Sequence, residues 1–323
     1  MNPEPLLLAP SGKDYLWGGN RLKSEYGKNL FLDPLAESWE CSVHPDGPSR
    51  IYSGSLKGRL LSDVLAEHTE WMGSKVPEGK GFPVLVKFID AAKDLSVQVH
   101  PDDEYARIYE NDNGKTEMWY VLEAEPGASL ACGFSHDVTK EQILNSLKIG
   151  TLSRYLNRTP VYKGDVFFIP PGTVHAIGAG LLIAEIQESS NVTYRVYDYD
   201  RVDKNGRKRE LHVEKALEVM NLNTGADLRQ KPRKVNYYPG CSRELLCRCR
   251  YFETELIVVS LGFAFSVTDT SFQILLCVDG EGGISTDEMF RPLRFHKGEC
   301  IFLPANTGRC HVIGTCRMLK IRC

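Results

Sequence analysis

The chain has 323 residues, of which 42% are hydrophobic, and a formal net charge of −3, so it can bury a substantial core as two domains or as one large barrel with additions. This balance of charge gives no overall attraction to nucleic acid or to anionic membranes. No apolar run approaches the roughly 20 residues of a membrane-spanning helix, and the short apolar segment 6–9 follows no basic stretch, so we expect a cytoplasmic protein.

The first third of the chain predicts short strands and one packing helix. Apolar stretches bounded by Gly and Pro predict strands at 6–8, 15–17 and 35–43. Leucine and valine residues at helical spacing predict a helix over 55–68.

Residues 82–89 predict a buried strand that contains Lys87. Burying an unpaired ammonium group is costly. Lys87 therefore needs either an anionic partner or an exit to solvent at the edge of a sheet.

The next segment carries side chains that could bind a metal. Strands are predicted at 95–99 and 118–122, and Gln98 and His100 are two residues apart, so on an extended strand they leave the same face. Glu117 opens the second strand. Taken alone, His100 could be a turn or core histidine, and Glu117 a solvated strand end.

A second histidine follows a tight turn. Gly164, Pro170, Gly172 and His175 mark a strand, a turn and a return strand, and their spacing is that of the second metal-binding motif of cupin barrels. Imidazole, carboxylate and amide oxygen atoms that converge from separate strands suit a divalent metal.

The remaining elements up to residue 220 are short strands and helices. Thr139 and Gln142 could cap one of the helices, and the basic cluster 204–209 around Asn205-Gly206 predicts a solvated hairpin tip. The predicted elements are a strand at 128–134, helices at 140–147 and 212–220, a helical turn at 151–156, and two strands within 181–200.

Residues 221–240 are richer in Gly, Pro and charged residues than the segments before them, which predicts a linker before a second small barrel. Residues 297–304 repeat the pattern of 163–170. Where the first copy has Gly172 and His175, the second has Asn306 and Arg309, and His311 comes two positions late. We expect the second barrel to lack a metal and to serve in packing.

The ten cysteines predict neither a disulfide scaffold nor a zinc knuckle. Eight of them follow residue 240, and no secretory segment accompanies them. Cys247 and Cys249 are too close together for a knuckle. We expect reduced cysteines that pack as small apolar residues.

Five motifs in order resemble the short bacterial type I mannose-6-phosphate isomerases. They are YLWGG at 15–19, SVQVHPDD at 96–103, GKTEMWYV at 114–121, PPGTVHAIG at 170–178 and NVTYRVYDYDR at 191–201. The resemblance implies a mainly β fold of two cupin, jelly-roll-like barrels with a few short helices. Residues 1–225 would form the catalytic, metal-binding cupin domain with small helical additions, and residues 226–323 a degenerate C-terminal cupin domain.

The same resemblance implies roles for site residues. One Zn²⁺ per chain would be held by Gln98, His100, Glu117 and His175. The resemblance also places Lys87 and Ser96 toward the substrate phosphate, Arg195 over the metal, and Glu37 and Trp39 near the site.

The implied reaction is the zinc-dependent interconversion of D-mannose 6-phosphate and D-fructose 6-phosphate through a cis-enediol. Such a reaction needs an electrophile and a proton carrier. Lys115, Glu185 and a zinc-bound water are the candidates for the carrier, and the sequence does not choose among them.

Three alternatives stay open. Two histidines and a glutamate could form the facial triad of an iron dioxygenase, another metal-dependent cupin could act on sugar phosphates, and a non-catalytic cupin could bind sugar without turnover. The expected partner is a hexose 6-phosphate, and we expect binding to neither nucleic acid nor membrane. The protein is expected to be a monomer or a weak homodimer.

Overall fold

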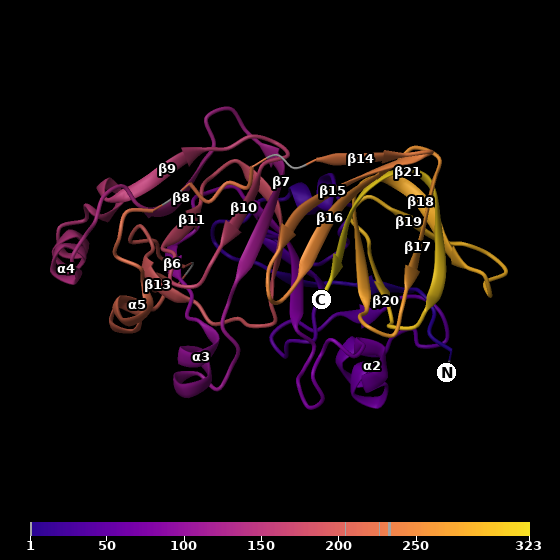
Figure 1. Cartoon of the computed structure of the whole chain (residues 1–323). Coiled ribbons are helices and arrows are strands. Elements are labelled where there is room, and N and C mark those ends of the chain that lie inside the picture. Colours follow the sequence, from indigo (N-terminus) through magenta and orange to yellow (C-terminus); the bar gives the residue numbers. More distant parts are fainter. Residues whose placement is uncertain (1, 204, 226, 232–233) are drawn as a thin grey trace.

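The structure is a computed structural model that describes residues 2–203, 205–225, 227–231 and 234–323. The described residues form three β-sheets of ten, six and five strands, together with a few short helices. Most of the ten-stranded sheet lies on the right in Figure 1, and the other two sheets lie on the left. The fold is mainly β, as predicted.

The ten-stranded sheet joins C-terminal strands to the first residues of the chain. Its order is β14-β15-β16-β21-β18-β20-β1-β4, with β17 on β21 and β19 on β18. The strands are β1 (Leu6–Ala9), β4 (Arg50–Ile51), β14 (Val235–Tyr238), β15 (Cys241–Arg248), β16 (Glu253–Val259), β17 (Gly262–Val267), β18 (Gln273–Thr286), β19 (Leu293–His296), β20 (Cys300–Leu303) and β21 (Gly308–Arg322).

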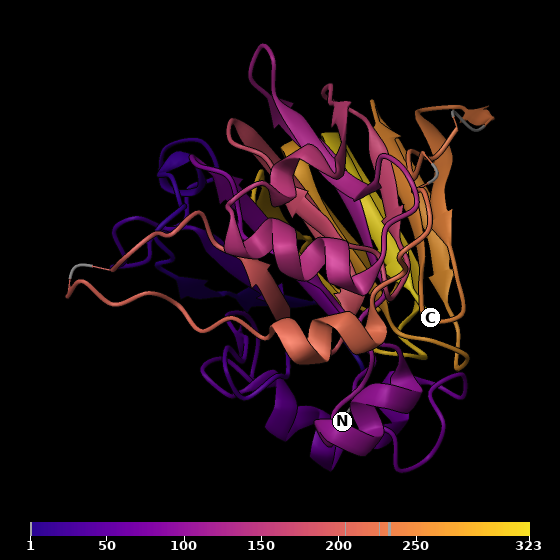
Figure 2. The ribbon, with the colours of Figure 1, turned by 90° about the vertical axis from the view of Figure 1, so that its left-hand side faces the viewer.

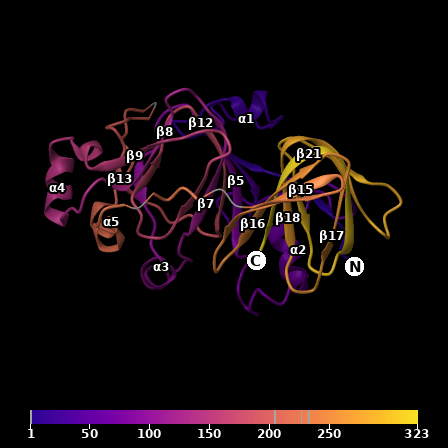
Figure 3. The ribbon, with the colours of Figure 1, turned by 45° about the horizontal axis from the view of Figure 1, so that its top comes forward.

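The two smaller sheets face one another, as Figure 3 shows, with β8, β9 and β13 on one side and β5, β7 and β12 on the other. The six-stranded sheet has the order β10 (Val166–Ile169), β7 (Glu117–Ala124), β12 (Leu181–Glu188), β5 (Val84–Ala91), β3 (Glu37–Cys41) and β2 (Ser11–Lys13). The five-stranded sheet has the order β13 (Tyr194–Tyr197), β6 (Val97–Val99), β11 (His175–Ile177), β8 (Ser129–Phe134) and β9 (Leu156–Pro160).

The helices are short and lie outside the sheets. Thr139 and Gln142 cap α4 reciprocally, as the sequence predicts. Figure 2 shows α4 and α5 in front of the strands. The helices are α1 (Arg21–Ser24), α2 (Leu61–Glu67), α3 (Asp103–Tyr109), α4 (Lys140–Lys148) and α5 (Val213–Val219), with 3₁₀ turns at Thr69–Met72 and Leu152–Arg154. No helix within the described ranges is long and apolar enough to cross a membrane.

The apolar core runs continuously from the six-stranded sheet into the ten-stranded one. Every residue of β5 and of β12 is buried, which their near-continuous apolar sequences favour. One cluster contains Phe88 and Leu182 of the six-stranded sheet together with Phe302 and Leu319 of the ten-stranded sheet. Most of the cysteines are buried, in agreement with the prediction that they pack as small apolar residues.

The predicted division into two cupin, jelly-roll-like barrels is not confirmed. All three sheets are open in their order of paired strands. In addition, β1 pairs antiparallel with β20, with Leu7 opposite Ile301, so the first residues of the chain belong to the C-terminal sheet. The domain boundary at residue 225 stays a prediction.

Several predicted elements differ from those observed. The strand at 15–17 is wrong, because Gly18 N–H donates to Tyr15 O at 2.9 Å and closes a turn there, and β2 lies earlier. The helix begins at Leu61 instead of residue 55, because Gly54 and Gly58 have φ of +65° and +92°, which interrupt a right-handed helix.

The linker at 221–240 contains the edge strand β14, whose backbone pairs with β15 despite its polar sequence. The basic hairpin is confirmed by a bridge between Val202 and Lys208, although Lys204 of that cluster lies outside the described residues. The other predicted strands and helices are present within a few residues of their predicted bounds.

Candidate metal centre

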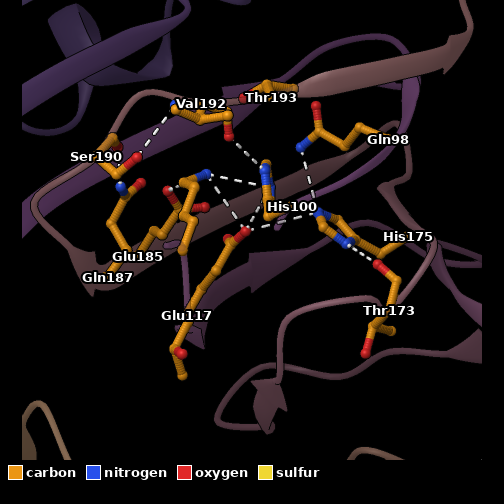
Figure 4. Close-up of polar contacts among 12 residues, drawn as sticks. Gln98, His100, Glu117, Thr173, His175, Glu185, Gln187, Ser190, Val192 and Thr193 are labelled. Atoms are coloured by element: carbon orange, nitrogen blue, oxygen red, sulfur yellow. Dashed lines mark hydrogen bonds and ion pairs between the residues drawn. The ribbon is translucent and has the colours of Figure 1, made fainter. Parts of the chain in front are cut away.

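The side chains predicted to bind a metal meet between the two smaller sheets. Gln98 lies on β6 directly opposite His175 of β11, and His100 follows the end of β6. Glu117, the first residue of β7, comes from the facing sheet. Figure 4 shows these four side chains pointing toward one another.

The distances within this cluster are short. The ligand atoms of His100, Glu117 and His175 all lie within 4.8 Å of one another. His100 Nε2 is 2.7 Å and His175 Nε2 is 3.6 Å from Glu117 Oε1. Gln98 Nε2 is 3.2 Å from His175 Nε2. The three residues of the cluster are at most 1% exposed.

Hydrogen bonds fix which ring nitrogen of each histidine faces the cluster. His100 Nδ1 lies 2.8 Å from Val192 O, and His175 Nδ1 lies 2.9 Å from Thr173 O. A carbonyl oxygen only accepts, so each Nδ1 carries the hydrogen and each Nε2 presents a lone pair to the cluster. Backbone carbonyls commonly orient metal-binding histidines in this way.

The protonation states also suit metal binding. Burial, and after it the Lys115 ammonium, lower the pKa of His100 to about 3, and burial lowers the pKa of His175. Burial alone would raise the pKa of Glu117, but the neighbouring Lys115 ammonium holds it well below its usual value. Two neutral imidazoles and a carboxylate therefore converge.

This donor set fits a divalent cation. His100 Nε2 and Glu117 Oε1 both present lone pairs across 2.7 Å, an arrangement that a cation between or beside them stabilises. Gln98 turns its amide nitrogen toward His175. Rotation of that amide by 180° would present its oxygen instead, because the two orientations have nearly the same shape. All four predicted ligands are thus brought together.

A row of alternating charges crosses the six-stranded sheet beside the cluster. In the strand register, Glu185 of β12 lies opposite Lys87 of β5. Lys87 Nζ is 3.5 Å from Glu185 and 3.8 Å from Glu37, and Lys115 Nζ is 3.9 Å from Glu185 and 3.3 Å from Glu117. Lys87 therefore has two anionic partners and does not reach solvent at a sheet edge.

Two tryptophans hold the carboxylates of this row. Trp119 Nε1 lies 2.8 Å from Glu117 Oε2 and 3.0 Å from Glu185 Oε2, and Trp39 Nε1 donates to Glu37 Oε2 at 2.8 Å. The role of Trp119 was not predicted from the sequence. The signal for it is the repeated spacing Glu-x-Trp, which puts the indole and the carboxylate on one face of a strand.

Glu185 is an acidic side chain of the cavity wall with a pKa near neutral. Burial, and after it the charge of Glu117, raise its pKa to about 7, although Lys115 and Lys87 oppose the rise. Its Oε1 is buried and has no hydrogen-bond partner among the described residues. Glu117 and Glu185 are thus neighbours whose pKa values are pushed in opposite directions, a pattern of paired acid and base groups.

A cavity of about 200 Å³ lies beside the cluster. Predicted site residues line it, namely Lys87, Ser96, Gln98, Lys115, Glu185 and Arg195. Four polar residues for which the sequence predicts no role also line it, namely Tyr15, Asn191, Thr193 and Arg209. A larger groove of about 1350 Å³ lies elsewhere, beside Trp71 and Phe82, and none of the predicted ligands lines it.

Arg195 is fixed at the wall of this cavity. It lies opposite Gln98 in the pairing of β13 with β6, and its Nη1 donates to Glu210 O at 2.7 Å. Its Nε is buried without a hydrogen-bond partner among the described residues. The guanidinium therefore adds a cation to the wall of the cavity beside Gln98.

Comparison with known proteins relates most of the chain to a single family. The family model described as "Phosphomannose isomerase type I, catalytic domain" matches residues 6–135, and the one described as "Mannose-6-phosphate isomerase, cupin domain" matches residues 243–323. The probable mannose-6-phosphate isomerase GmuF of Bacillus subtilis is 38% identical over 98% of both chains. Mannose-6-phosphate isomerase ManA of the same organism is 37% identical over 95% of both.

A solved structure shares the whole fold. The crystal structure of the mannose 6-phosphate isomerase from Bacillus subtilis superposes with a TM-score of 0.91 and 32% identity, and the match covers 98% of this chain and 99% of that one.

Proposed function

Because the chain belongs to the type I mannose-6-phosphate isomerases, we propose that it interconverts D-mannose 6-phosphate and D-fructose 6-phosphate at the metal centre described above. The family activity is aldose–ketose isomerisation. The observation that carries the proposal is a buried histidine–glutamate cluster that adjoins a row of alternating carboxylates and ammonium groups, several of which line one cavity.

We propose that Gln98, His100, Glu117 and His175 hold one Zn²⁺. Bound there, the ion would act as a redox-inert Lewis acid toward a sugar oxygen. The carbonyls of Val192 and Thr173 keep both Nε2 lone pairs directed inward.

The reaction moves a proton between adjacent sugar carbons, and we assign a cis-enediol as the intermediate. Glu185 has a buried oxygen, Oε1, without a hydrogen-bond partner among the described residues and a pKa of about 7, so it can take up and return a proton near neutral pH. Lys115 Nζ lies between Glu117 and Glu185 and is the second candidate for the proton carrier. Arg195 would stabilise negative charge that develops on the substrate oxygens.

The substrate phosphate would be bound by Lys87 and Ser96. Both line the cavity, together with Arg195 and Arg209. Two carboxylates already lie near Lys87, so a phosphate there would share the ammonium group with them. Charge-assisted hydrogen bonds suit this contact.

We also propose that residues 1–225 act as the catalytic cupin unit and residues 226–323 as a degenerate one, each of them jelly-roll-like. Support comes from the two family models, which match separate segments. The turn before β21 resembles the turn before β11, since Asn306 and Gly172 both have positive φ, at 65° and 79°. In the second copy, His311 lies 3.1 Å from Asp287.

A coupled assay that detects fructose 6-phosphate tests the proposal. Turnover of mannose 6-phosphate that is lost on chelation and restored by Zn²⁺ is expected. Binding of the sugar phosphate without turnover would identify a non-catalytic cupin. Oxygen consumption that requires iron would identify a dioxygenase.

A further inference from the structure

The backbone on both sides of Lys115 is held by buried or partly buried carboxylates. Gly114 N–H donates to Asp103 Oδ1 at 3.0 Å, and Thr116 N–H donates to Glu188 Oε1 at 2.8 Å. The N–H of Lys115 itself donates to Pro101 O at 3.1 Å. Three consecutive amides are therefore fixed immediately before the metal ligand Glu117, and the Lys115 ammonium reaches the cluster from this segment.

The Asp103 carboxylate also binds the C-terminal part of the molecule. Its second oxygen, Oδ2, accepts a hydrogen bond of 2.9 Å from the hydroxyl of Tyr251. Tyr251 lies in the turn between β15 and β16, which is closed by the N–H of Cys249 donating to Phe252 O at 3.0 Å. In Figure 1, α3 lies left of centre and β15 and β16 lie right of centre, so the contact bridges the two halves of the ribbon.

The segment before Lys115 also packs directly against the start of α3. A Cβ atom on Gly114 would lie only 2.4 Å from Asp103 N and 2.5 Å from Asp102 C. No side chain separates the two backbones. A displacement of Asp103 would therefore be transmitted to Gly114 and Lys115 without an intervening flexible group.

We propose that Tyr251 is a positioning residue for the isomerisation. By holding Asp103, it fixes the backbone before Lys115, so that Lys115 Nζ stays 3.2 Å from His100 Nε2 and 3.3 Å from Glu117 Oε1. The inference rests on the proposed function, because it concerns the proton-transfer geometry of that reaction. It gives the C-terminal unit a part in turnover in addition to packing.

The substitution Tyr251→Phe removes only the hydroxyl. It keeps the aromatic ring, over which the Arg250 guanidinium lies at 5.7 Å. We expect kcat to fall about tenfold with KM within about twofold, because misplacement of a reacting group lowers turnover more than binding. Zinc content should not change. Tyr237→Phe is the matched control, since Tyr237 is 81% exposed on the same sheet, and it should leave kcat unaltered.

A double-mutant cycle separates positioning from a general loss of stability. If Tyr251 acts through Asp103, then Tyr251→Phe should have no further effect on kcat in an Asp103→Ala background. Effects on kcat that multiply in the double variant would overturn the inference, as would an unchanged kcat in folded Tyr251→Phe.

Amide hydrogen exchange gives a readout that needs no substrate. Exchange at Gly114 and Thr116 should be faster in Tyr251→Phe than in wild type or Tyr237→Phe. If wild type shows no isomerase turnover, the proposed function fails. Unchanged protection of these two amides in Tyr251→Phe would separately overturn the inference that Tyr251, through Asp103, fixes the backbone before Lys115.

Discussion

At the scale of single residues, the site depends on which nitrogen of each imidazole carries its hydrogen. Val192 and Thr173 fix this through backbone carbonyls, which no side-chain motif encodes. The members of this cluster can be predicted from the sequence because residue type and strand parity are visible in it. The sequence could not predict the tautomers, or the contact of Trp119 with both Glu117 and Glu185, because these depend on how separate strands align.

The substitution His100→Ala should remove both metal and turnover. It deletes a neutral, inward-facing nitrogen donor from a cluster that is closed to solvent. We expect zinc per chain, measured by elemental analysis, to fall to background and kcat/KM to fall more than about a hundredfold. His311→Ala is the matched control, because this histidine is partly exposed and lies beside Asp287. Retention of full zinc by His100→Ala would contradict the ligand assignment.

The substitution Lys87→Met should weaken use of the phosphorylated substrate. A charge-assisted hydrogen bond to an anion contributes roughly 1.5–3 kcal/mol, so kcat/KM for mannose 6-phosphate should fall about ten- to a hundredfold. Zinc content should be that of wild type. Lys93→Met, at an exposed position after the same strand, is the control. An unaltered kcat/KM with full zinc would show that Lys87 serves only its two carboxylate neighbours.

At the scale of elements, the alignment of β7, β12, β5 and β3 creates the row of charges. Each of these strands was predicted, but their order in the sheet was not, because β5 and β12 are separated by almost a hundred residues of sequence and paired in space. Predictions from local sequence patterns were also wrong where a glycine sets the backbone conformation. The predicted helix at 55–68 loses its first turns because Gly58 has φ of +92°.

The end of β12 holds the start of β7 through Glu188, and this contact predicts a dependence of stability on pH. Burial, and after it the charge of Asp103, raise the pKa of Glu188 to about 8, against the hydrogen bond from Thr116. Between its ordinary pKa of 4.5 and about 8, the folded protein keeps a proton that the unfolded chain has lost. The contribution of this group to stability is thus present below pH 4.5 and is lost as pH rises toward 8.

The variant Glu188→Gln should therefore lose less stability than wild type between about pH 5 and pH 8. Urea midpoints at the two pH values measure the difference. Glu141→Gln, on the exposed face of α4, should behave like wild type. Equal pH dependence in all three proteins would show that Glu188 titrates normally.

At the scale of the whole molecule, the N-terminal segment and the C-terminal sheet form one packed structure. β1 lies in the ten-stranded sheet beside β20, and the ammonium of Lys28 binds both Glu40, at 2.6 Å, and the carbonyl of Gly298. Sequence periodicity could not reveal the pairing of β1 with β20 or the contact of Lys28 with Gly298, since each joins positions more than 250 residues apart.

The substitution Lys28→Ala should destabilise the whole protein. It leaves the fully buried Glu40 carboxyl, whose pKa burial raises, without its ammonium partner. Loss of one partner of a buried ion pair costs about 3–5 kcal/mol. Urea unfolding measures the change, and Lys23→Ala, whose partner Asp33 is 79% exposed, should cost at most about 1 kcal/mol. Equal losses in the two variants would contradict the structural role of Lys28.

The most direct measurement is the titration of Zn²⁺ back into chelated protein while mannose 6-phosphate turnover and bound metal are followed in the same sample. Gln98, His100, Glu117 and His175 form one cluster in the described part of the chain, so turnover should rise linearly and reach its maximum at one equivalent. Full turnover in metal-free protein, or a maximum reached only at two equivalents, would contradict a single catalytic metal centre.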